Sequence, residues 1–394
     1  MDAKADAPLN HATAADDSLV RGGPFFRLQR ALGLIRPNQW NLGRRITFFV
    51  ALAWLPMLVL TVLLNPKGLP SFLIEYRIYA RLFLAIPALL IGEVLMATRF
   101  REVWAHIRQA ELLDAPDLAY MNKVIATLVR VREALLPELA VLALLVVHTA
   151  TSYRGLVDST PWLGHGTGAD FHLTPAGWYG IVVSAPLFQF FLGLSLWKWL
   201  QWTYFTFRLS QRHLKLVPAH PDQHAGLGFL GHTAAAFAPI AFAVSAVVGA
   251  TWRNDILYHG ARLMDFKLPA IALLVIVALI GLGPLAFFVP KLAVLRRKGI
   301  MEYALLGHIQ SAAFHEKWIL RRAGHEAEFL QAQESTTLNN YGQAFTRINQ
   351  LKPFPADLNS LYTLAAAVAI PALPTVLAQI PLVVVLTDLL KALR

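Results

Sequence analysis

Residues 268–289 read LPAIALLVIVALIGLGPLAFFV and contain no charged side chain. An α-helix of this length spans about 30 Å, because each residue adds about 1.5 Å along the helix axis. That span matches the hydrocarbon core of a typical bilayer. We therefore predict that this stretch crosses a membrane as a helix, and this prediction sets the class of the whole protein.

Similar apolar segments recur along the chain of 394 residues. They occupy residues 46–64, 82–97, 135–151, 177–197, 229–252 and 361–386. With 56% hydrophobic and 15% charged residues, the composition excludes a disordered chain, a fibre and a secreted scaffold. The predicted fold class is all-α, a polytopic membrane protein with about seven transmembrane helices and a helical cytoplasmic layer. Pro371, Pro374 and Pro381 predict a kinked or broken last helix within residues 361–394.

The lysines and arginines are unevenly distributed over the loops. The formal net charge is +11, and with the amino terminus inside, 25 basic residues lie in cytoplasmic pieces against 9 in the opposite pieces. Because basic loops stay cytoplasmic, this asymmetry predicts a cytoplasmic N-terminus and an external C-terminus. The basic excess is then a topology signal, so the expected partner is a lipid bilayer and not nucleic acid.

The regions between and beside the apolar segments have their own patterns. Residues 1–23 lack an apolar core and predict a disordered cytoplasmic tail. Residues 24–37 interleave apolar and arginine side chains, which is typical of an interfacial amphipathic helix. Within the six-helix membrane region at 46–289, heptad-like spacing over residues 98–134 predicts a cytoplasmic helical hairpin. Residues 291–358 continue a helical pattern and predict a second cytoplasmic element.

Ionisable residues inside apolar segments are candidate binding residues, because burying a charge in lipid is costly. Glu93 and Glu138 lie near the cytoplasmic ends of the second and third segments, so antiparallel threading places them at similar depth. Together they could share a proton or bind a cation. His148 lies further out on the third segment, at a distance of about 15 Å from Glu138 along a helix. In the alternative interpretation, the two carboxylates pair separately with arginines at the membrane interface, namely Arg99, Arg130 or Arg132.

A second group of candidates lies before the fifth segment, where residues 213–231 read HLKLVPAHPDQHAGLGFLG. Gly226 and Gly228 begin a G-x-G-x-x-G pattern, but the strand that a dinucleotide site requires is absent from the sequence pattern. A helix start of this kind favours anions such as phosphate or chloride, and the alternative is a capped helix with close packing. His220, Asp222 and His224 could ligate a metal in principle, although surface or capping histidines are the better interpretation.

The same loop carries a resemblance to known proteins. His220-Pro-Asp followed by Gly-Leu-Gly-Phe-Leu-Gly at residues 226–231 resembles a loop of an uncharacterised family of polytopic bacterial inner-membrane proteins. The resemblance implies a bacterial inner membrane as the location. It implies no activity, so no functional residue is transferred from it.

Three classes of function remain open. The absence of cysteine excludes disulfides, cysteine-ligated zinc, iron–sulfur clusters and a thiol nucleophile, and no cofactor or metal is expected. Intramembrane carboxylates, a broken last helix and a glycine-rich helix start favour a channel or transporter for a small ion or solute. The first alternative is a membrane scaffold or sensor that binds another protein through its cytoplasmic helices. Separately, a homo-oligomer is among the expected partners. A lipid-modifying enzyme is the least favoured, because no convergent nucleophile or metal motif is present.

Overall fold

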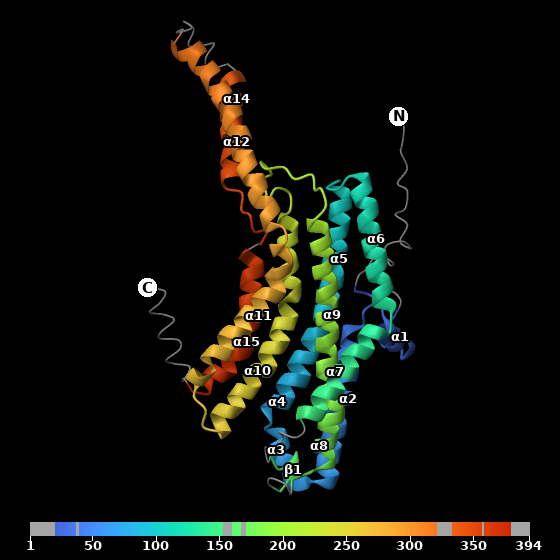
Figure 1. Ribbon diagram of the computed structural model, residues 1–394. Coiled ribbons are helices and arrows are strands. Elements are labelled where there is room, and N and C mark those ends of the chain that lie inside the picture. Colours follow the sequence, from blue (N-terminus) through green and yellow to red (C-terminus); the bar gives the residue numbers. More distant parts are fainter. Residues whose placement is uncertain are drawn as a thin grey trace, which may run out of the picture.

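The computed structural model describes residues 20–36, 39–152, 160–166, 171–320, 333–356 and 358–379, and most of these residues are helical (Figure 1). The α-helices are α1 (Pro24–Ala31), α2 (Leu42–Leu64), α3 (Leu69–Leu73), α4 (Tyr76–Tyr79), α5 (Ile86–Gln109), α6 (Ala115–Glu133), α7 (Leu136–Ser152), α8 (Pro175–Tyr179), α9 (Ala185–Ser210), α10 (Ala238–Tyr258), α11 (Lys267–Ala286), α12 (Val289–Phe314), α14 (Gln333–Asn349) and α15 (Leu358–Leu377). Tighter or wider helical turns are η1 (Pro66–Gly68), η2 (Ala80–Ala85), η5 (Gly180–Ser184), η6 (Gly228–Phe237), η7 (Leu263–Phe266) and η8 (His315–Leu320). The strands β1 (Gly164–His165) and β2 (His172–Leu173) form a short antiparallel pair.

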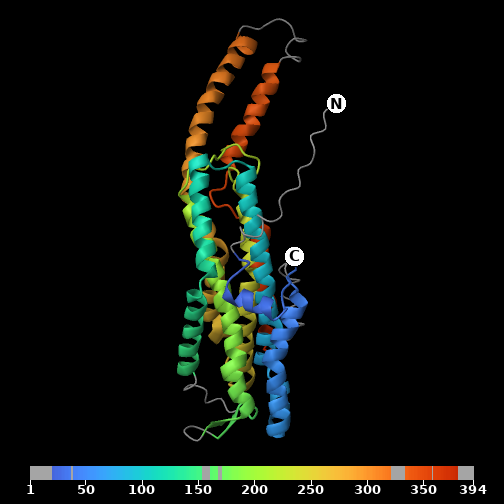
Figure 2. The ribbon, with the colours of Figure 1, turned by 90° about the vertical axis from the view of Figure 1, so that its right-hand side faces the viewer.

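Six of the described helices are long and apolar enough to cross a membrane, which confirms a helical membrane protein. These helices are Leu42–Leu64, Tyr76–Gln109, Pro175–Ser210, Gly228–Tyr258, Leu263–Ala286 and Leu358–Leu377. The remaining predicted segment, at residues 135–151, forms α7, whose apolar part Leu136–Thr149 is shorter. The long helices run side by side in one bundle (Figures 1 and 2).

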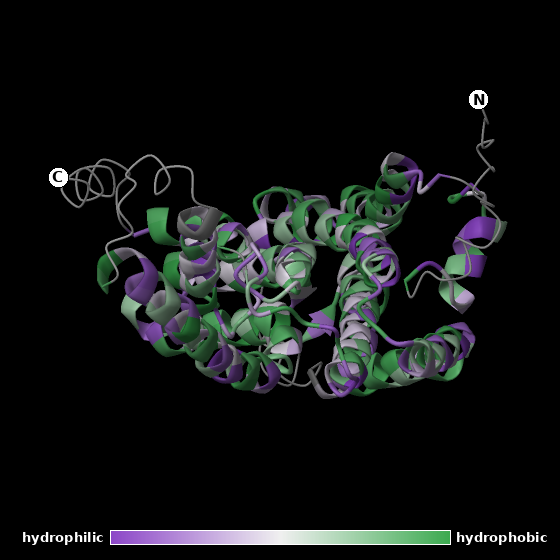
Figure 3. Ribbon diagram, turned by 90° about the horizontal axis from the view of Figure 1, so that it is seen from above, coloured by the Kyte–Doolittle hydropathy of each residue, from purple (hydrophilic) through white to green (hydrophobic). Residues whose placement is uncertain are grey.

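The outer surface of the bundle is apolar, as a lipid environment requires. Leu63 of α2 is 71% exposed, and Leu144 of α7 and Leu279 of α11 are 68% and 60% exposed. Viewed along the bundle, hydrophobic residues line much of the periphery (Figure 3). The interior is also apolar, with the buried Trp202 of α9 stacked on Phe100 of α5 at 4.2 Å between ring centroids. An apolar exterior around an apolar core indicates that acyl chains and not water surround these helices.

Prolines explain two irregular turns in the membrane helices. Pro87 and Pro186 each stand at the start of a regular helix, directly after the π-helical turns η2 and η5. A proline cannot donate to the carbonyl one turn earlier, and its ring clashes with that carbonyl. The wider π-helical turn gives the chain room before the proline, so the helix continues across the irregularity.

The last membrane helix packs closely on α10. A Cβ atom on Gly249 would lie 3.2 Å from Oγ1 of Thr375, which is a tight contact, so glycine favours this close approach of the two backbones. The hydroxyl of Thr375 donates to the carbonyl of Gly249 at 2.7 Å, and that of Ser245 donates to the carbonyl of Val368 at 2.7 Å. The helix α15 continues through Pro371 and Pro374 without a break, because α10 supplies these additional contacts. Pro381, the third proline of the segment predicted to be kinked or broken, lies outside the described residues.

The two ends of the bundle differ, and we call them the Glu75 end and the Asp222 end, each after a carboxylate residue that lies there. The Glu75 end contains α3, the β1–β2 pair and the contact between Glu75 and Trp162. At the Asp222 end, the α5–α6 turn pairs with the loop 211–227 through a backbone bridge between Leu113 and Leu214. The helices α12 and α14 pack on each other and project beyond this end (Figures 1 and 2). Of the predicted tail at 1–23, residues 1–19 lie outside the described part of the chain.

Candidate functional site

Glu93 is the centre of a buried charge cluster that joins three membrane helices. Its Oε2 accepts a hydrogen bond from Nη2 of Arg45 at 2.5 Å, and its Oε1 accepts one from Nζ of Lys198 at 2.5 Å. Arg45 belongs to α2, Glu93 to α5 and Lys198 to α9. The side chain of Arg45 is fully buried, while those of Glu93 and Lys198 are 10% and 13% exposed. A carboxylate held by two cations at this depth ties α2, α5 and α9 together.

A further layer of contacts orients the guanidinium of Arg45. Its Nε donates to Oε1 of Gln29 on α1 at 2.8 Å, and it lies over the Trp40 ring at 5.9 Å from the centroid. Within the described residues, Nη1 of Arg45 is buried without a hydrogen-bond partner. The helix α1 is thereby attached to the charge cluster through Gln29, which the amphipathic pattern of residues 24–37 did not indicate.

Glu138 makes contacts of a different kind, to the start of α1. Both oxygens of its carboxylate accept a hydrogen bond from the backbone N–H of Phe25, at 3.0 and 2.9 Å. A carboxylate at this position satisfies a free N–H of the first helical turn and complements the helix dipole. The helix α9 packs against both α5 and α7. Glu93 and Glu138 thus have different hydrogen-bond partners among the described residues. Those partners are not the arginines that the alternative interpretation predicted, which were Arg99, Arg130 and Arg132.

Asp222 organises the loop at its end of the bundle. The backbone N–H groups of His224 and Gly228 donate to its carboxylate at 2.8 Å each, and that of Gly226 donates to both oxygens at 3.1 Å. The His220 ring lies 2.8 Å from Oδ1. Although partial burial alone would raise the pKa of Asp222, these donors outweigh it and hold the pKa below its ordinary value.

The predicted anion site at the glycine pattern is thus filled from within the chain. The N–H groups of Gly226 and Gly228 point at Asp222, so a carboxylate of the protein takes the place of an external phosphate. His224 turns to the carbonyl of Lys352 at 3.2 Å, which fastens the loop to the segment before α15. Within the described residues, no three His, Asp or Glu side chains converge where they could hold a metal ion.

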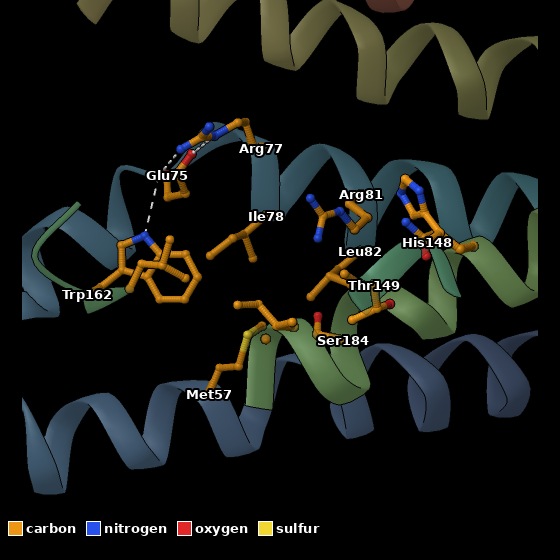
Figure 4. A pocket seen from close by; sticks show the side chains of 15 residues that line it. Met57, Glu75, Arg77, Ile78, Arg81, Leu82, His148, Thr149, Trp162 and Ser184 are labelled. Atoms are coloured by element: carbon orange, nitrogen blue, oxygen red, sulfur yellow. Dashed lines mark hydrogen bonds and ion pairs between the residues drawn. The ribbon is translucent and has the colours of Figure 1, made fainter. Parts of the chain in front are cut away.

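A cavity of about 190 Å³ lies toward the Glu75 end, between α2, α7 and the two π-helical turns η2 and η5. We call it the Arg81 cavity (Figure 4). It is lined by Met57, Glu75, Arg77, Ile78, Arg81, Leu82, His148, Thr149, Trp162, Leu163, Gly180, Ile181, Ser184, Ala185 and Gln189. The π-helical turns displace the backbone from its regular path, and turns of this kind recur at functional sites.

The charges on the cavity wall do not cancel. Arg77 binds Glu75 through two hydrogen bonds, at 2.7 and 3.2 Å, and the indole N–H of Trp162 lies 3.4 Å from the same carboxylate. Among the residues described, the Arg81 guanidinium forms no hydrogen bond or ion pair, and it faces the cavity from η2 (Figure 4). Arg81 therefore has no directly bonded counter-ion among the described residues, and because such a charge is costly in a membrane helix, it marks a candidate functional site.

His148 is the one sequence-predicted candidate that lines the Arg81 cavity, where it stands near Arg81 in Figure 4. Ser184 of η5 and Thr149 of α7 present hydroxyl groups on the same side. Oε1 of Gln189 is buried without a hydrogen-bond partner within the described residues. The cavity thus offers a cation and a few polar groups on a mainly apolar wall, which is the usual composition of a small-molecule site.

A second cavity, of about 300 Å³, lies beyond the Glu75–Arg77 pair, and both residues line it as well. Arg253 of α10 contributes a further cation there, 4.8 Å above the Tyr76 ring. The Oγ1 atom of Thr160 is buried in this region without a partner within the described residues. We call this space the Tyr76 cavity. The two cavities share Glu75 and Arg77 in their walls.

Most residues of the Arg81 cavity were not singled out from the sequence. Two signals were present: an arginine beside the second apolar segment, and the prolines Pro87 and Pro186 within two different segments. Each signal is ambiguous alone, because an arginine near a helix end reaches the headgroups and prolines are common in membrane helices. Their joint meaning requires knowing that η2 and η5 line the same cavity.

Comparisons of the sequence with family models, with curated proteins and with solved structures find no match.

Proposed function

We propose that this protein is a transporter or channel for a small ion or solute in a bacterial inner membrane. In this proposal the N-terminus and the Asp222 end are cytoplasmic and the Glu75 end faces outward, in agreement with the distribution of basic residues. The short helix α7 counts as the seventh transmembrane helix. The α5–α6 turn, together with α12 and α14, forms the helical cytoplasmic layer.

The Arg81 cavity is the observation that supports this proposal most strongly. It lies within the membrane-spanning helices, it contains polar groups, and its walls include two irregular turns. Irregular helices in membranes are tolerated where they line a cavity or pack on protein, and such places carry the binding sites of transporters. The Tyr76 cavity shares Glu75 and Arg77 with it, and in this proposal a solute approaches from the outside through that cavity.

A flux measurement with a cavity-filling variant tests the proposal. Gly180→Leu places its Cβ at ordinary contact distance, 3.4 Å from Sδ of Met57 and 3.6 Å from the Trp162 ring, so its outer carbons fill the cavity. Gly283→Leu is the matched control, because nothing lies within 4 Å of a Cβ on Gly283 in the membrane helix α11.

Purified protein is reconstituted in liposomes, and fluxes of protons, monovalent cations and small anions are recorded. We expect the wild type to move at least one solute above protein-free vesicles, Gly180→Leu to lose that flux and Gly283→Leu to keep it. Absence of flux for every solute, or equal flux through Gly180→Leu, overturns the proposal.

One observation favours the alternative of a scaffold or sensor. Met301, Leu305 and Ile309 form a row along α12 and are 68%, 65% and 58% exposed on the projecting pair α12–α14. An apolar row outside the lipid-facing bundle suits binding of a protein or of a second copy of this chain. If this is the function, Leu305→Ser disrupts the oligomer measured by light scattering, whereas Gly180→Leu leaves it unchanged.

A further inference from the structure

We infer that the Arg81 cavity binds a small organic anion whose carboxylate contacts Arg81 and whose apolar body fills the rest of the cavity. This inference rests on the proposed function, because it names the class of solute that the same site takes. It depends on three features of the described residues: the charge balance, the character of the wall and the volume.

The charge balance selects an anion. Glu75 is engaged by Arg77 and Trp162, at 2.7 and 3.4 Å respectively, so its negative charge is already matched. A carboxylate approaching Arg81 would supply the counter-charge that the described lining residues lack. A guanidinium presents two parallel N–H groups to a carboxylate, and this fork geometry gives a strong and directional contact. A cation would instead meet the positive charge of Arg81, while the one carboxylate in the lining is already bonded to Arg77, so a cation is disfavoured.

The wall selects an apolar body. Met57, Ile78, Leu82, Trp162 and Ile181 line the space next to the polar end. Inorganic phosphate or chloride would leave these side chains against empty space or poorly bonded water, since apolar cavities do not hold water well. A molecule with a hydrocarbon part replaces that water and gains hydrophobic contact.

The volume limits the size of the ligand. An apolar cavity of about 150 Å³ accommodates one benzene molecule. The Arg81 cavity, at about 190 Å³, has room for a benzene-sized body with one carboxylate added. Benzoate is therefore a suitable probe. A two-chain lipid is much too large, although its headgroup phosphate shares part of the chemistry.

Equilibrium binding in detergent tests the inference without requiring transport. Three probes are titrated into the purified full-length protein by calorimetry: benzoate, its neutral isostere benzamide, and inorganic phosphate, which has the charge but no apolar body. We expect benzoate to bind more tightly than either of the other two. Arg81→Gln should weaken benzoate binding by roughly tenfold to a hundredfold, because a hydrogen bond to a charged group is lost.

Controls keep each outcome decisive. Lys67→Gln removes an exposed cation near the Glu75 end and should leave benzoate binding unchanged. Arg81→Lys keeps the positive charge but loses the two parallel N–H donors of the guanidinium, so it should weaken benzoate binding less than Arg81→Gln does. Benzamide binding as tightly as benzoate, phosphate binding as tightly as benzoate, or benzoate binding unaffected in Arg81→Gln overturns the inference. If Arg81→Gln does not fold, the ranking of the three probes on the wild type still decides.

Failure of the inference and failure of the proposed function are distinguishable. Liposome flux of another solute without benzoate binding contradicts the anion assignment and leaves transport standing. Benzoate binding that depends on Arg81, together with no flux of benzoate or any scanned solute, supports the binding site and contradicts transport.

Discussion

Neutralising Glu93 removes the one carboxylate within ion-pair distance of both Arg45 and Lys198 among the described residues. In Glu93→Gln the amide keeps the shape and loses the charge, so two cations with side chains 0% and 13% exposed remain uncompensated. Removing one partner of a buried pair costs about 3–5 kcal/mol of unfolding free energy, because the remaining charge is neither hydrated nor paired. We expect a loss at the upper end of that range, since one carboxylate serves two cations.

The matched control lies on the same helix. Glu102 forms an ion pair with Arg99 at 2.8 Å, but both side chains are about half exposed, at 53% and 47%. Glu102→Gln should therefore cost less than about 1 kcal/mol. The assay is reversible unfolding of the purified protein in mixed micelles of increasing denaturing detergent. A loss for Glu93→Gln no larger than that for Glu102→Gln would refute the account of the charge cluster.

Three further predictions concern the Asp222 loop, the contact between α10 and α15, and the threading of the chain. Asp222→Asn should lower the melting temperature at pH 7. Because the pKa of Asp222 is depressed in the folded state, the charged carboxylate stabilises the fold fully above the ordinary pKa of 3.8, and this stabilisation is lost as the pH falls below it. The difference in melting temperature between variant and wild type should therefore shrink in acid. Gly249→Leu should separate α10 from α15 and cost about 1–3 kcal/mol or more in the same detergent titration, whereas an unchanged stability would show that the two backbones are not in contact. Since the chain has no cysteine, a single cysteine introduced at Lys67 or at Gln211 reports the topology of that position. A membrane-impermeant maleimide should label the cysteine at position 67 in intact cells and the cysteine at position 211 only after lysis. Labelling of both positions from one side would contradict the proposed threading.

The class of fold was predictable from the sequence because a membrane-spanning helix is a local property. The run at residues 268–289 needs no partner to be recognised, and it lies within the helical stretch Leu263–Ala286 and the start of α12. The α7 region shows the limit of this reasoning. Its apolar run at 135–151 predicted a spanning helix, and the helix that forms is shorter than the other six, so the count of seven stays a prediction.

The polar contacts were less predictable because they join residues far apart in the sequence. Glu93 and Lys198 are 105 positions apart, and nothing near Glu93 in the sequence indicates that its partners come from α2 and α9. The glycine pattern at residues 226–231 suggested an open anion site, but Asp222 reaches forward and occupies those N–H groups itself. A side chain that caps a nearby turn competes with an external ligand, and the spacing of glycines alone does not reveal it.

Diffraction from crystals grown with 4-bromobenzoate shows whether the Arg81 cavity is the solute site. The bromine atom gives an anomalous signal that locates the ligand without reference to any function assay. The account predicts one strong peak among the apolar residues Met57, Ile78 and Leu82, with the carboxylate within hydrogen-bond distance of Arg81. A cavity without a bromine peak in crystals that show the ligand elsewhere, or a ligand whose carboxylate points away from Arg81, would contradict it.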